Sequence, residues 1–507
     1  MLGEDAVRSD PASLARYTDP YALPADAAAR LPAAALLPAD REQVQAVVRI
    51  AAGEGIALWP VSGGNNLAYG GGAARTPGDV MLDLRRMDRI VSVDPALACA
   101  VVEPGVRYVD LHAHLRDAGL SLWIDPPAFG EGSIVGNTLE RGFGVTSYGE
   151  HADTHCGLEV VLPDGSVVRT GMAALGDVAS AHARRDGYGP SFDGLFFQSN
   201  LGVVTQMGVW LMPAPEHVLF CHGSFRSEDD LGPLVEILRD LRLHDVLNGR
   251  AVVESPVRWM AAVSRRTAWQ DGDGPLTPAA LADMVRRAGI GWWNLRFGLY
   301  GPAGLTDARW RTARRALAAI PGARLSARAW RPGDPLAGAG DAGLAGVPSM
   351  AAMAMLRWPE GSGCTPGNGA HLDVGPICPA TGADALRQYR LVRDQAAAHG
   401  FDYYGGFTAA PRFLHHIFAA IYDRTDGGQA ARARELCRGL TVALGEAGYG
   451  MYRAHLDQMD LAAAQYAAHD HAALRLAERI KAALDPAGVL APGKQGVWPG
   501  RPRARER

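Results

Sequence analysis

The sequence predicts an α+β protein of more than one domain, on three observations. The chain has 507 residues, whereas an ordinary domain has roughly 100 to 200. Segments with the apolar spacing of helices lie among short β-branched runs. The segment 213–217, Pro-Ala-Pro-Glu-His, indicates a break in regular structure, and further predicted helices and strands follow it. We therefore expect a first domain over 1–217 and a second domain from 218.

The first domain begins with a helix over 42–53, where apolar residues recur at helical spacing before a glycine. A strand follows and runs into a glycine turn at 62–64. The remaining predicted elements are strands at 80–84, 89–94 and 99–105, an amphipathic helix at 108–119, a hairpin at 157–171 around Pro-Asp-Gly, and a long strand at 200–213.

The second domain is expected to mix helices and strands up to residue 450. A glycine-rich link at 333–349 interrupts it, and the chain has no internal repeat. The tail at 484–499 is too apolar and glycine-rich for a free linker, so 451–507 should return to the first domain. The predicted elements are helices at 229–245, 307–320 and 427–448 and strands at 292–301 and 323–330.

Composition narrows the classes of partner. Fifty Lys and Arg against 54 Asp and Glu leave no basic excess, so nucleic acid is not an expected partner. Gly and Pro interrupt the apolar stretches before the roughly 20 residues that span a bilayer. The first residues lack the apolar core of a secretory signal, so we expect a soluble, cytoplasmic protein. The six scattered cysteines are expected to be reduced and mostly buried.

Three glycine-rich segments are suited to holding a phosphate-bearing cofactor. The first, Pro60-Val61-Ser62-Gly63-Gly64-Asn65-Asn66, follows a strand and lets successive backbone N–H groups approach an anion. The second runs from Gly130 to Thr138 and the third from Gln198 to Gly202. None is a GxGxxG or a GxxxxGK[ST] motif, so neither a Rossmann site nor a P-loop is predicted.

These segments resemble the vanillyl-alcohol oxidase and 4-cresol dehydrogenase flavoprotein family. The resemblance runs through PVSGGNNLAYGGGAAR, GSIVGNTLERGFGVTSYGEH, GYGPSFDGLFFQSNLGVVT, GYGMYRAH and LDPAGVLAPGKQGVWP. It implies a two-domain PCMH-type FAD-binding fold: an FAD domain over 1–217, an α+β cap over 218–450, and a returning C-terminal segment over 451–507. The residues that it implies in FAD binding are the seven from Pro60 to Asn66 together with Gly132, Ser133, Gly136, Asn137, Asn200, Gly202, Val203, Val204, His371, Arg453 and Lys494.

The resemblance also implies a phenol site made of Tyr69, Tyr452 and Arg453. A guanidinium beside two phenol donors favours a bound phenolate over a phenol. A phenolate can expel a hydride from its para side chain, leaving a neutral quinone methide.

His371 matches the histidine that carries FAD through its 8α-methyl group in the family's oxidases. A histidine rather than a tyrosine at this position favours O2 over a cytochrome as electron acceptor, because the tyrosyl-linked member is the cytochrome-coupled one.

Adjacent His415 and His416 on a strand would face opposite sides and are interpreted as packing. His151, His155 and Cys156 lack the usual ligand spacing, so no metal is predicted.

Two residues, Glu150 and Asp373, are candidates for the catalytic carboxylate. Glu150 stands where the family commonly has Asp; the alternatives are that it only pairs with Arg141, or that Asp373 takes the role. If 371–375 is a strand, Asp373 shares the flavin-facing side with His371, and it could be the counter-ion of an amine on the substrate. Gly375 and Gly406 stand where a family member has larger polar residues, which predicts a wider pocket.

The leading hypothesis is a covalent-FAD oxidase of para-substituted phenols, with O2 as acceptor and a homodimer or higher homo-oligomer as the expected assembly. Two alternatives stay open: an enzyme for a non-phenolic alcohol or hydroxy acid, in which Arg453 binds a carboxylate, and a flavin-fold protein with a binding or non-redox role. Of the two lysines, Lys494 is expected beside the flavin and Lys481 is expected to be a solvated surface residue.

Overall fold

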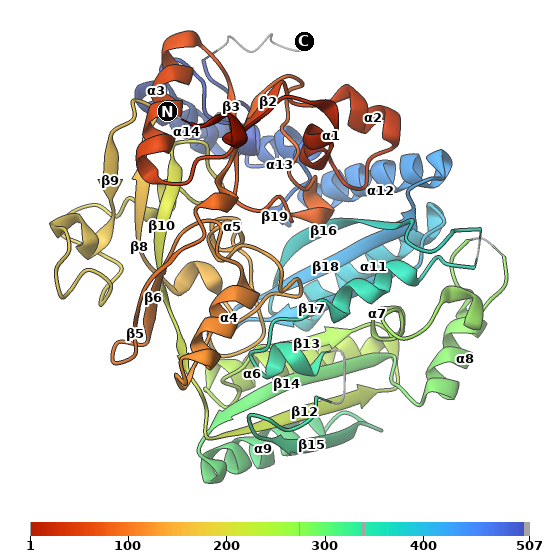
Figure 1. The fold of residues 1–507 in the computed structure, drawn as a ribbon. Coiled ribbons are helices and arrows are strands. Elements are labelled where there is room, and N and C mark those ends of the chain that lie inside the picture. The colour runs from red at the N-terminus through yellow and green to blue at the C-terminus, as the bar shows by residue number, and fades with distance from the viewer. Residues whose placement is uncertain (1, 273, 337–339, 362, 501–507) are drawn as a thin grey trace.

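The computed structural model describes residues 2–272, 274–336, 340–361 and 363–500, and these residues form two main parts (Figure 1). The first part holds two larger sheets and one two-stranded sheet, all built from strands before residue 214. The second part is built on a large sheet whose strands lie between His217 and Arg453. The C-terminal helices return to the first part and lie beside its N-terminal elements (Figure 1).

The first sheet supports the glycine-rich turn. In it β2, β4 and β3 are parallel, and β1 pairs antiparallel with β2. The helix α3 begins after Asp40, whose carboxylate accepts a hydrogen bond from the Gln43 N–H, and ends at Gly55 in a left-handed conformation. Its apolar face packs against Leu58 and Leu82. The bounds are β1 Val7–Arg8, α1 Pro11–Leu14, α2 Pro24–Ala29, β2 Ala34–Leu36, α3 Arg41–Glu54, β3 Leu58–Val61 and β4 Val80–Asp83.

The second sheet has the strand order β5-β6-β10-β8-β9 among the described residues. Adjacent strands in this sheet are antiparallel, and the predicted hairpin joins β8 to β9. Two helices accompany it, and the shorter one begins after Ser133. The bounds are β5 Ile90–Asp94, β6 Cys99–Val102, α4 Tyr108–Asp117, β7 Leu122–Trp123, α5 Ile134–Leu139, β8 His155–Val161, β9 Val167–Arg169, β10 Val203–Trp210 and β11 Met212–Pro213.

The cap sheet is antiparallel in the described residues, with the order β15-β12-β14-β13-β17-β18-β16-β19 (Figure 1). Its last strand, β19, is the segment that the sequence analysis assigned to the phenol site. The strands are β12 His217–Phe225, β13 Ala251–Glu254, β14 Trp293–Gly301, β15 Arg324–Trp330, β16 Gly369–Pro379, β17 Tyr404–Ala409, β18 Phe413–Asp423 and β19 Met451–Arg453. The helices are α6 Leu231–Leu243, α7 Pro256–Met260, α8 Pro278–Ala288, α9 Ala303–Leu317, α10 Asp341–Leu344, α11 Gly382–Ala398 and α12 Gly427–Glu446.

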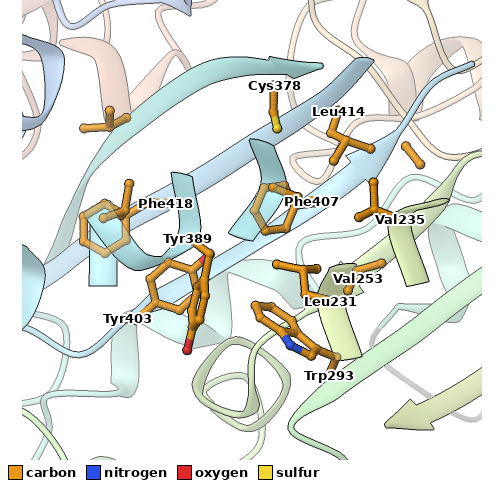
Figure 2. Close-up of a cluster of buried hydrophobic side chains, with 14 of the residues drawn as sticks. Leu231, Val235, Val253, Trp293, Cys378, Tyr389, Tyr403, Phe407, Leu414 and Phe418 are labelled. Carbon is orange, nitrogen blue, oxygen red and sulfur yellow. The ribbon is translucent and has the colours of Figure 1, made fainter. Parts of the chain in front are cut away.

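One face of the cap sheet is buried under helices. Figure 2 shows Trp293, Tyr389, Tyr403, Phe407 and Phe418 gathered in this core, with aliphatic side chains of α6 beside them. Trp293 meets Tyr389 edge to face with ring centroids 4.9 Å apart, a preferred aromatic geometry. The opposite face of the sheet is therefore the face left for a ligand.

The C-terminal return is fastened by a residue that we expected in solvent. Lys481, on α14 (Ala468–Leu484), is wholly buried, so the prediction of a solvated lysine was wrong. Its ammonium donates to the Asn200 and Leu490 carbonyls, each at 2.7 Å, and to the Asp485 carboxylate at 2.5 Å. A buried charge is tolerated only with such partners. With α13 (Met459–Ala464), this segment packs on the first part.

The sequence located most elements within a few residues, with two informative differences. Helix α9 begins at Ala303, four residues before the predicted start, because Gly304 and the polar residues of its first turn hide the helical period. The sequence analysis missed strand β12 because the strand begins at His217, the last residue of the Pro-rich segment 213–217 that indicated a break between elements. The predicted link at 333–349 lies partly outside the described residues. The six cysteines are free and buried, and none of the described helices is long and apolar enough to span a membrane.

Candidate active site

A cavity of about 480 Å³ lies between the two larger sheets of the first part and the cap sheet. Its walls come from the turn after β3, from α5, from the start of β10, from the exposed face of the cap sheet and from the C-terminal tail. Every residue predicted to bind the cofactor lines this cavity, as do Tyr69, Tyr452 and Asp373. Glu150, Gly375 and Gly406 are not among the lining residues.

The glycine turn and α5 come together closely at one end of the cavity. Gly64 has φ +74°, a left-handed conformation that leaves successive N–H groups free to face an anion. A Cβ on Gly136 would lie 2.3 Å from Ser62 Oγ, so a larger residue there would force this hydroxyl to rotate away from α5. Ser133 caps α5 by accepting from the Gly136 N–H at 3.0 Å. This end is suited to a phosphate-bearing group.

Tyr69, Tyr452 and Arg453 form one group in the cavity wall. The Arg453 guanidinium carbon lies 5.6 Å from the Tyr69 ring centre and 5.5 Å from that of Tyr452. Arg453 Nε donates to the Glu140 carbonyl at 2.5 Å, which fixes the guanidinium. Burial raises the pKa of both phenols, and Arg453 opposes that rise. The two tyrosines therefore stay protonated as donors beside a permanent cation.

His371 projects a free ring nitrogen toward the same cavity. Its Nδ1 lies 2.8 Å from Asp373 Oδ1, and a carboxylate only accepts, so Nδ1 carries the proton. Nε2 is buried and has no hydrogen-bond partner among the described residues. Buried polar atoms are rarely left without a partner. Asp373 thus makes Nε2 the nucleophilic nitrogen of this histidine.

Glu150 lies behind the wall and pairs with an arginine from the cap. Its Oε2 is 3.2 Å from Nη1 of Arg250, so the alternative pairing with Arg141 was not the main one. The same guanidinium donates through Nη2 to His415 Nδ1 at 2.7 Å. Burial raises the pKa of Glu150 against the effect of Arg250. Phe143, whose backbone forms a β-bridge with Glu150 and whose ring stacks on His415, lines the cavity next to these groups.

The two adjacent histidines face opposite sides of β18, as the sequence predicted. His416 contacts the Tyr403 hydroxyl at 2.9 Å within the buried core. His415 lies against Tyr452 with ring centroids 4.9 Å apart. Burial, with Arg250 and Arg453, lowers the pKa of His415 to about 2, so it stays neutral. In the described residues, no group of three or more His, Cys, Asp and Glu side chains is placed to hold a metal ion.

Comparison with known proteins decides the family. An FAD binding domain model matches residues 32–171, and the model of the FAD linked oxidases, C-terminal domain, matches residues 380–495. The 4-cresol dehydrogenase [hydroxylating] flavoprotein subunit of Pseudomonas putida is 32% identical over 98% of this chain and 94% of its own length.

The chain belongs to the vanillyl-alcohol oxidase and 4-cresol dehydrogenase flavoprotein family.

Two further relatives match along nearly the whole chain. The solved 4-ethylphenol oxidase of Gulosibacter chungangensis, in complex with isoeugenol, is 38% identical with a TM-score of 0.92, covering 99% of this chain and 96% of that one. The 1'-carboxy-chondrochloren decarboxylase of Chondromyces crocatus is 30% identical over 93% of this chain and 92% of its own length. The protein is thus an FAD-dependent oxidoreductase with the PCMH-type FAD-binding fold.

The cavity fits the FAD that this flavoprotein family binds. The Gly64 turn and α5 offer N–H groups at one end, and the unpartnered Nε2 of His371 faces the cavity. Lys494, the predicted flavin contact, lines the cavity and pairs with Glu140 at 2.5 Å. Although burial acts to raise it, Lys494 and Arg453 hold the pKa of Glu140 below its usual range. Sequence reasoning missed Glu140, although it lies inside the matched segment GNTLERG.

Gly375 and Gly406, where the sequence analysis expected a wider pocket, each lie close to other atoms of the protein. A Cβ at Gly375 would lie 2.5 Å from the Tyr452 ring, so glycine makes room for that ring. A Cβ at Gly406 would lie 2.5 Å from the Val253 carbonyl and 3.3 Å from Arg258 Cδ. The space that these glycines leave is filled by protein atoms. The expected wider pocket therefore does not follow from them directly.

Proposed function

We propose that this enzyme is an FAD-dependent oxidase of para-substituted phenols. The observation that carries the proposal is the convergence of Tyr69, Tyr452 and Arg453 on one wall of the cofactor cavity. Two phenol donors and a guanidinium are suited to a phenolate oxygen, whose charge they stabilise in a site shielded from water. Two relatives, a 4-cresol dehydrogenase and a 4-ethylphenol oxidase, have names that agree with this chemistry.

These three residues promote oxidation of the side chain by favouring the bound phenolate, which can expel a hydride where a neutral phenol cannot. A phenolate that loses a hydride from its α-carbon becomes a neutral quinone methide, so the negative charge held by Arg453 leaves with the hydride. FAD held by the glycine turn, α5 and His371 would supply the hydride acceptor, and O2 would be the final acceptor of the two electrons and two protons, as H2O2. A quinone methide then gains water at the α-carbon or loses a proton to give an alkene.

We further propose that His371 carries the FAD covalently through its Nε2. The support is the unpartnered buried nitrogen, together with the carboxylate of Asp373 that keeps the proton on Nδ1. The histidyl linkage is also the reason for proposing O2 as the acceptor. An oxidation of a non-phenolic hydroxy acid at Arg453 is less well supported, because two tyrosine hydroxyls beside the guanidinium match a phenolate rather than a carboxylate.

The proposal is tested by anaerobic reduction of the bound flavin with matched compounds. We expect 4-ethylphenol to bleach the flavin at 450 nm or thereabouts, and 4-ethylanisole, which cannot form a phenolate, to leave it oxidised. Readmitted air should then restore the absorbance and release H2O2. Equal reduction by both compounds, or reduction by hydroxy acids alone, would overturn the proposed substrate class.

Replacing Glu150 by Gln is expected to slow anaerobic flavin reduction by roughly tenfold or more, about 1.4 kcal/mol of lost transition-state stabilisation. The variant keeps the shape of the side chain and removes the charge that faces Arg250, so the electron-poor quinone methide loses a nearby anion. Stopped-flow absorbance measures the rate. Glu360→Gln is the matched control, because Glu360 is a buried carboxylate paired with Arg265 outside the cavity. Wild-type rates in Glu150→Gln would leave the role to Asp373 or to no carboxylate.

A further inference from the structure

The cap side of the cavity ends in an arginine whose hydrogen-bonding capacity is largely unused. Arg258, on α7, donates from Nε to Glu254 at 3.0 Å and lies over the Tyr404 ring at 5.3 Å. Neither of its Nη groups has a hydrogen-bond partner among the described residues, and the side chain lines the cavity. A guanidinium normally presents five N–H donors in a fixed fork. Most of this fork faces open space inside the protein.

The charges next to Arg258 leave it only partly compensated. Glu254 is the one carboxylate within ion-pair distance, and it is shared: Arg296 also lies 3.0 Å from it. Both arginines line the cavity, while Glu254 does not. Within ion-pair distance, two guanidiniums against one carboxylate leave an excess of one positive charge, and the more distant charge of Asp373 also acts on Arg258. A ligand group with one negative charge would complete this set, and a bidentate carboxylate matches the open fork.

The register of the cap sheet places Arg258 opposite the phenol site. The Tyr452 ring lies over Gly375, and Arg258 Cδ lies over Gly406. Ile417 pairs with Gly406, and its side chain reaches Gly375 on the same face of the sheet. Gly375 and Gly406 are thus separated by two strand spacings, or about 10 Å. A phenol held by Tyr452 would bring a short side chain of a few carbon atoms toward Arg258.

From this arrangement we infer that the para side chain of the substrate ends in a carboxylate, which Arg258 binds. The inference rests on the proposed phenol oxidation and narrows its substrate class to 4-hydroxyphenyl acids with a short alkyl chain. Arg258 then fixes the far end of the substrate and sets specificity, while Tyr69, Tyr452 and Arg453 hold the phenolate end.

An amine at the same end would need Asp373 as its counter-ion, and the structure commits that carboxylate elsewhere. Asp373 Oδ1 is 2.8 Å from His371 Nδ1, and it lies on β16, two strands from β17. A cationic group beside Arg258 and Arg296 would meet two like charges. The contacts of Asp373 and the excess charge near Arg258 therefore both favour an acid over an amine.

The test compares compounds that differ only in charge. Anaerobic stopped-flow reduction of the holoenzyme is measured with 3-(4-hydroxyphenyl)propanoate, its primary amide, tyramine and 4-propylphenol, and the concentration dependence of the reduction rate gives Kd and the limiting rate separately. We expect the acid to bind at least tenfold more tightly than the amide and tyramine to bind most weakly. In Arg258→Met the affinity for the acid should fall at least tenfold, with 4-propylphenol changed less than threefold. Arg265→Met, which removes a half-exposed arginine outside the cavity, should change neither.

The outcomes separate this inference from the proposed function. If 4-propylphenol reduces the flavin but the acid has no advantage over the amide, or if tyramine binds best, the carboxylate inference is wrong and phenol oxidation stands. If Arg258→Met lowers the affinity for the acid and the affinity for 4-propylphenol equally, Arg258 is structural and the inference also fails. If no phenol in the set reduces the flavin, the proposed function itself fails. Arg258→Lys, which keeps the charge but not the fork, should recover part of the affinity for the acid.

Discussion

Acid-precipitated wild-type protein is expected to stay yellow, whereas precipitated His371→Ala should be colourless. The Nε2 of His371 is the buried ring nitrogen without a partner in the cavity wall, and Asp373 holds the proton on the other nitrogen. Alanine removes the atom that would bond the cofactor, while the glycine turn and α5 still bind FAD noncovalently. Absorbance of the washed pellet and in-gel flavin fluorescence measure the linkage.

Two variants sharpen this result. Asp373→Asn should reduce the covalently bound fraction, because an amide no longer fixes the tautomer of His371. His222→Ala, which removes a partly exposed histidine of the cap outside the cavity, should leave the pellet yellow. A colourless wild-type pellet would contradict the linkage, and a yellow His371→Ala pellet would assign it to another residue.

Arg453→Met is expected to lower the rate of anaerobic flavin reduction by phenols at neutral pH by about a hundredfold or more, roughly 2.7 kcal/mol. The guanidinium lies near both tyrosine rings and is the permanent cation closest to them. Without it, burial leaves a bound phenol with a pKa at or above its solution value of about 10. The reactive phenolate fraction of the variant should then rise about tenfold per pH unit from pH 6 to 9, while the wild-type rate stays nearly level.

The pH profile distinguishes loss of charge from loss of structure. A variant that merely folds poorly would be slow at every pH, whereas the expected variant recovers as the pH approaches 10. Arg75→Met is the control, since Arg75 is an arginine with little exposure that pairs with Asp460 outside the cavity. A flat, slow profile for Arg453→Met would sink the phenolate explanation.

Most of the site residues that the sequence predicted lie in continuous local motifs. The turn at Pro60 to Asn66 and the helix after Ser133 are local motifs, so their glycines and caps can be read without knowing the fold. His371 and Asp373 were placed on one face because alternation along a strand is also local. These are the parts of the site that depend on neighbours in sequence.

The partners that depend on strand register could not be predicted. Glu150 meets Arg250 across 100 residues, and nothing near either residue indicates the other. The sequence analysis assigned no element or role to Arg258, and the pairing of β13 with β17 is what places it over Gly406. Lys481 was misjudged because a lysine in a helix is usually solvated, and its partners Asn200 and Leu490 come from separate segments.

The buried ammonium of Lys481 has a consequence for the order of events during synthesis. It fastens the loop at Asn200 to the tail at Leu490, and Leu490, Ala491 and Lys494 are themselves part of the cavity wall. The glycine turn that begins at residue 60 leaves the ribosome early, but the part of the cavity wall at Leu490 to Lys494 is translated more than 400 positions later. A complete cofactor site therefore exists only once the tail has emerged and docked, so flavin capture follows translation of nearly the whole chain.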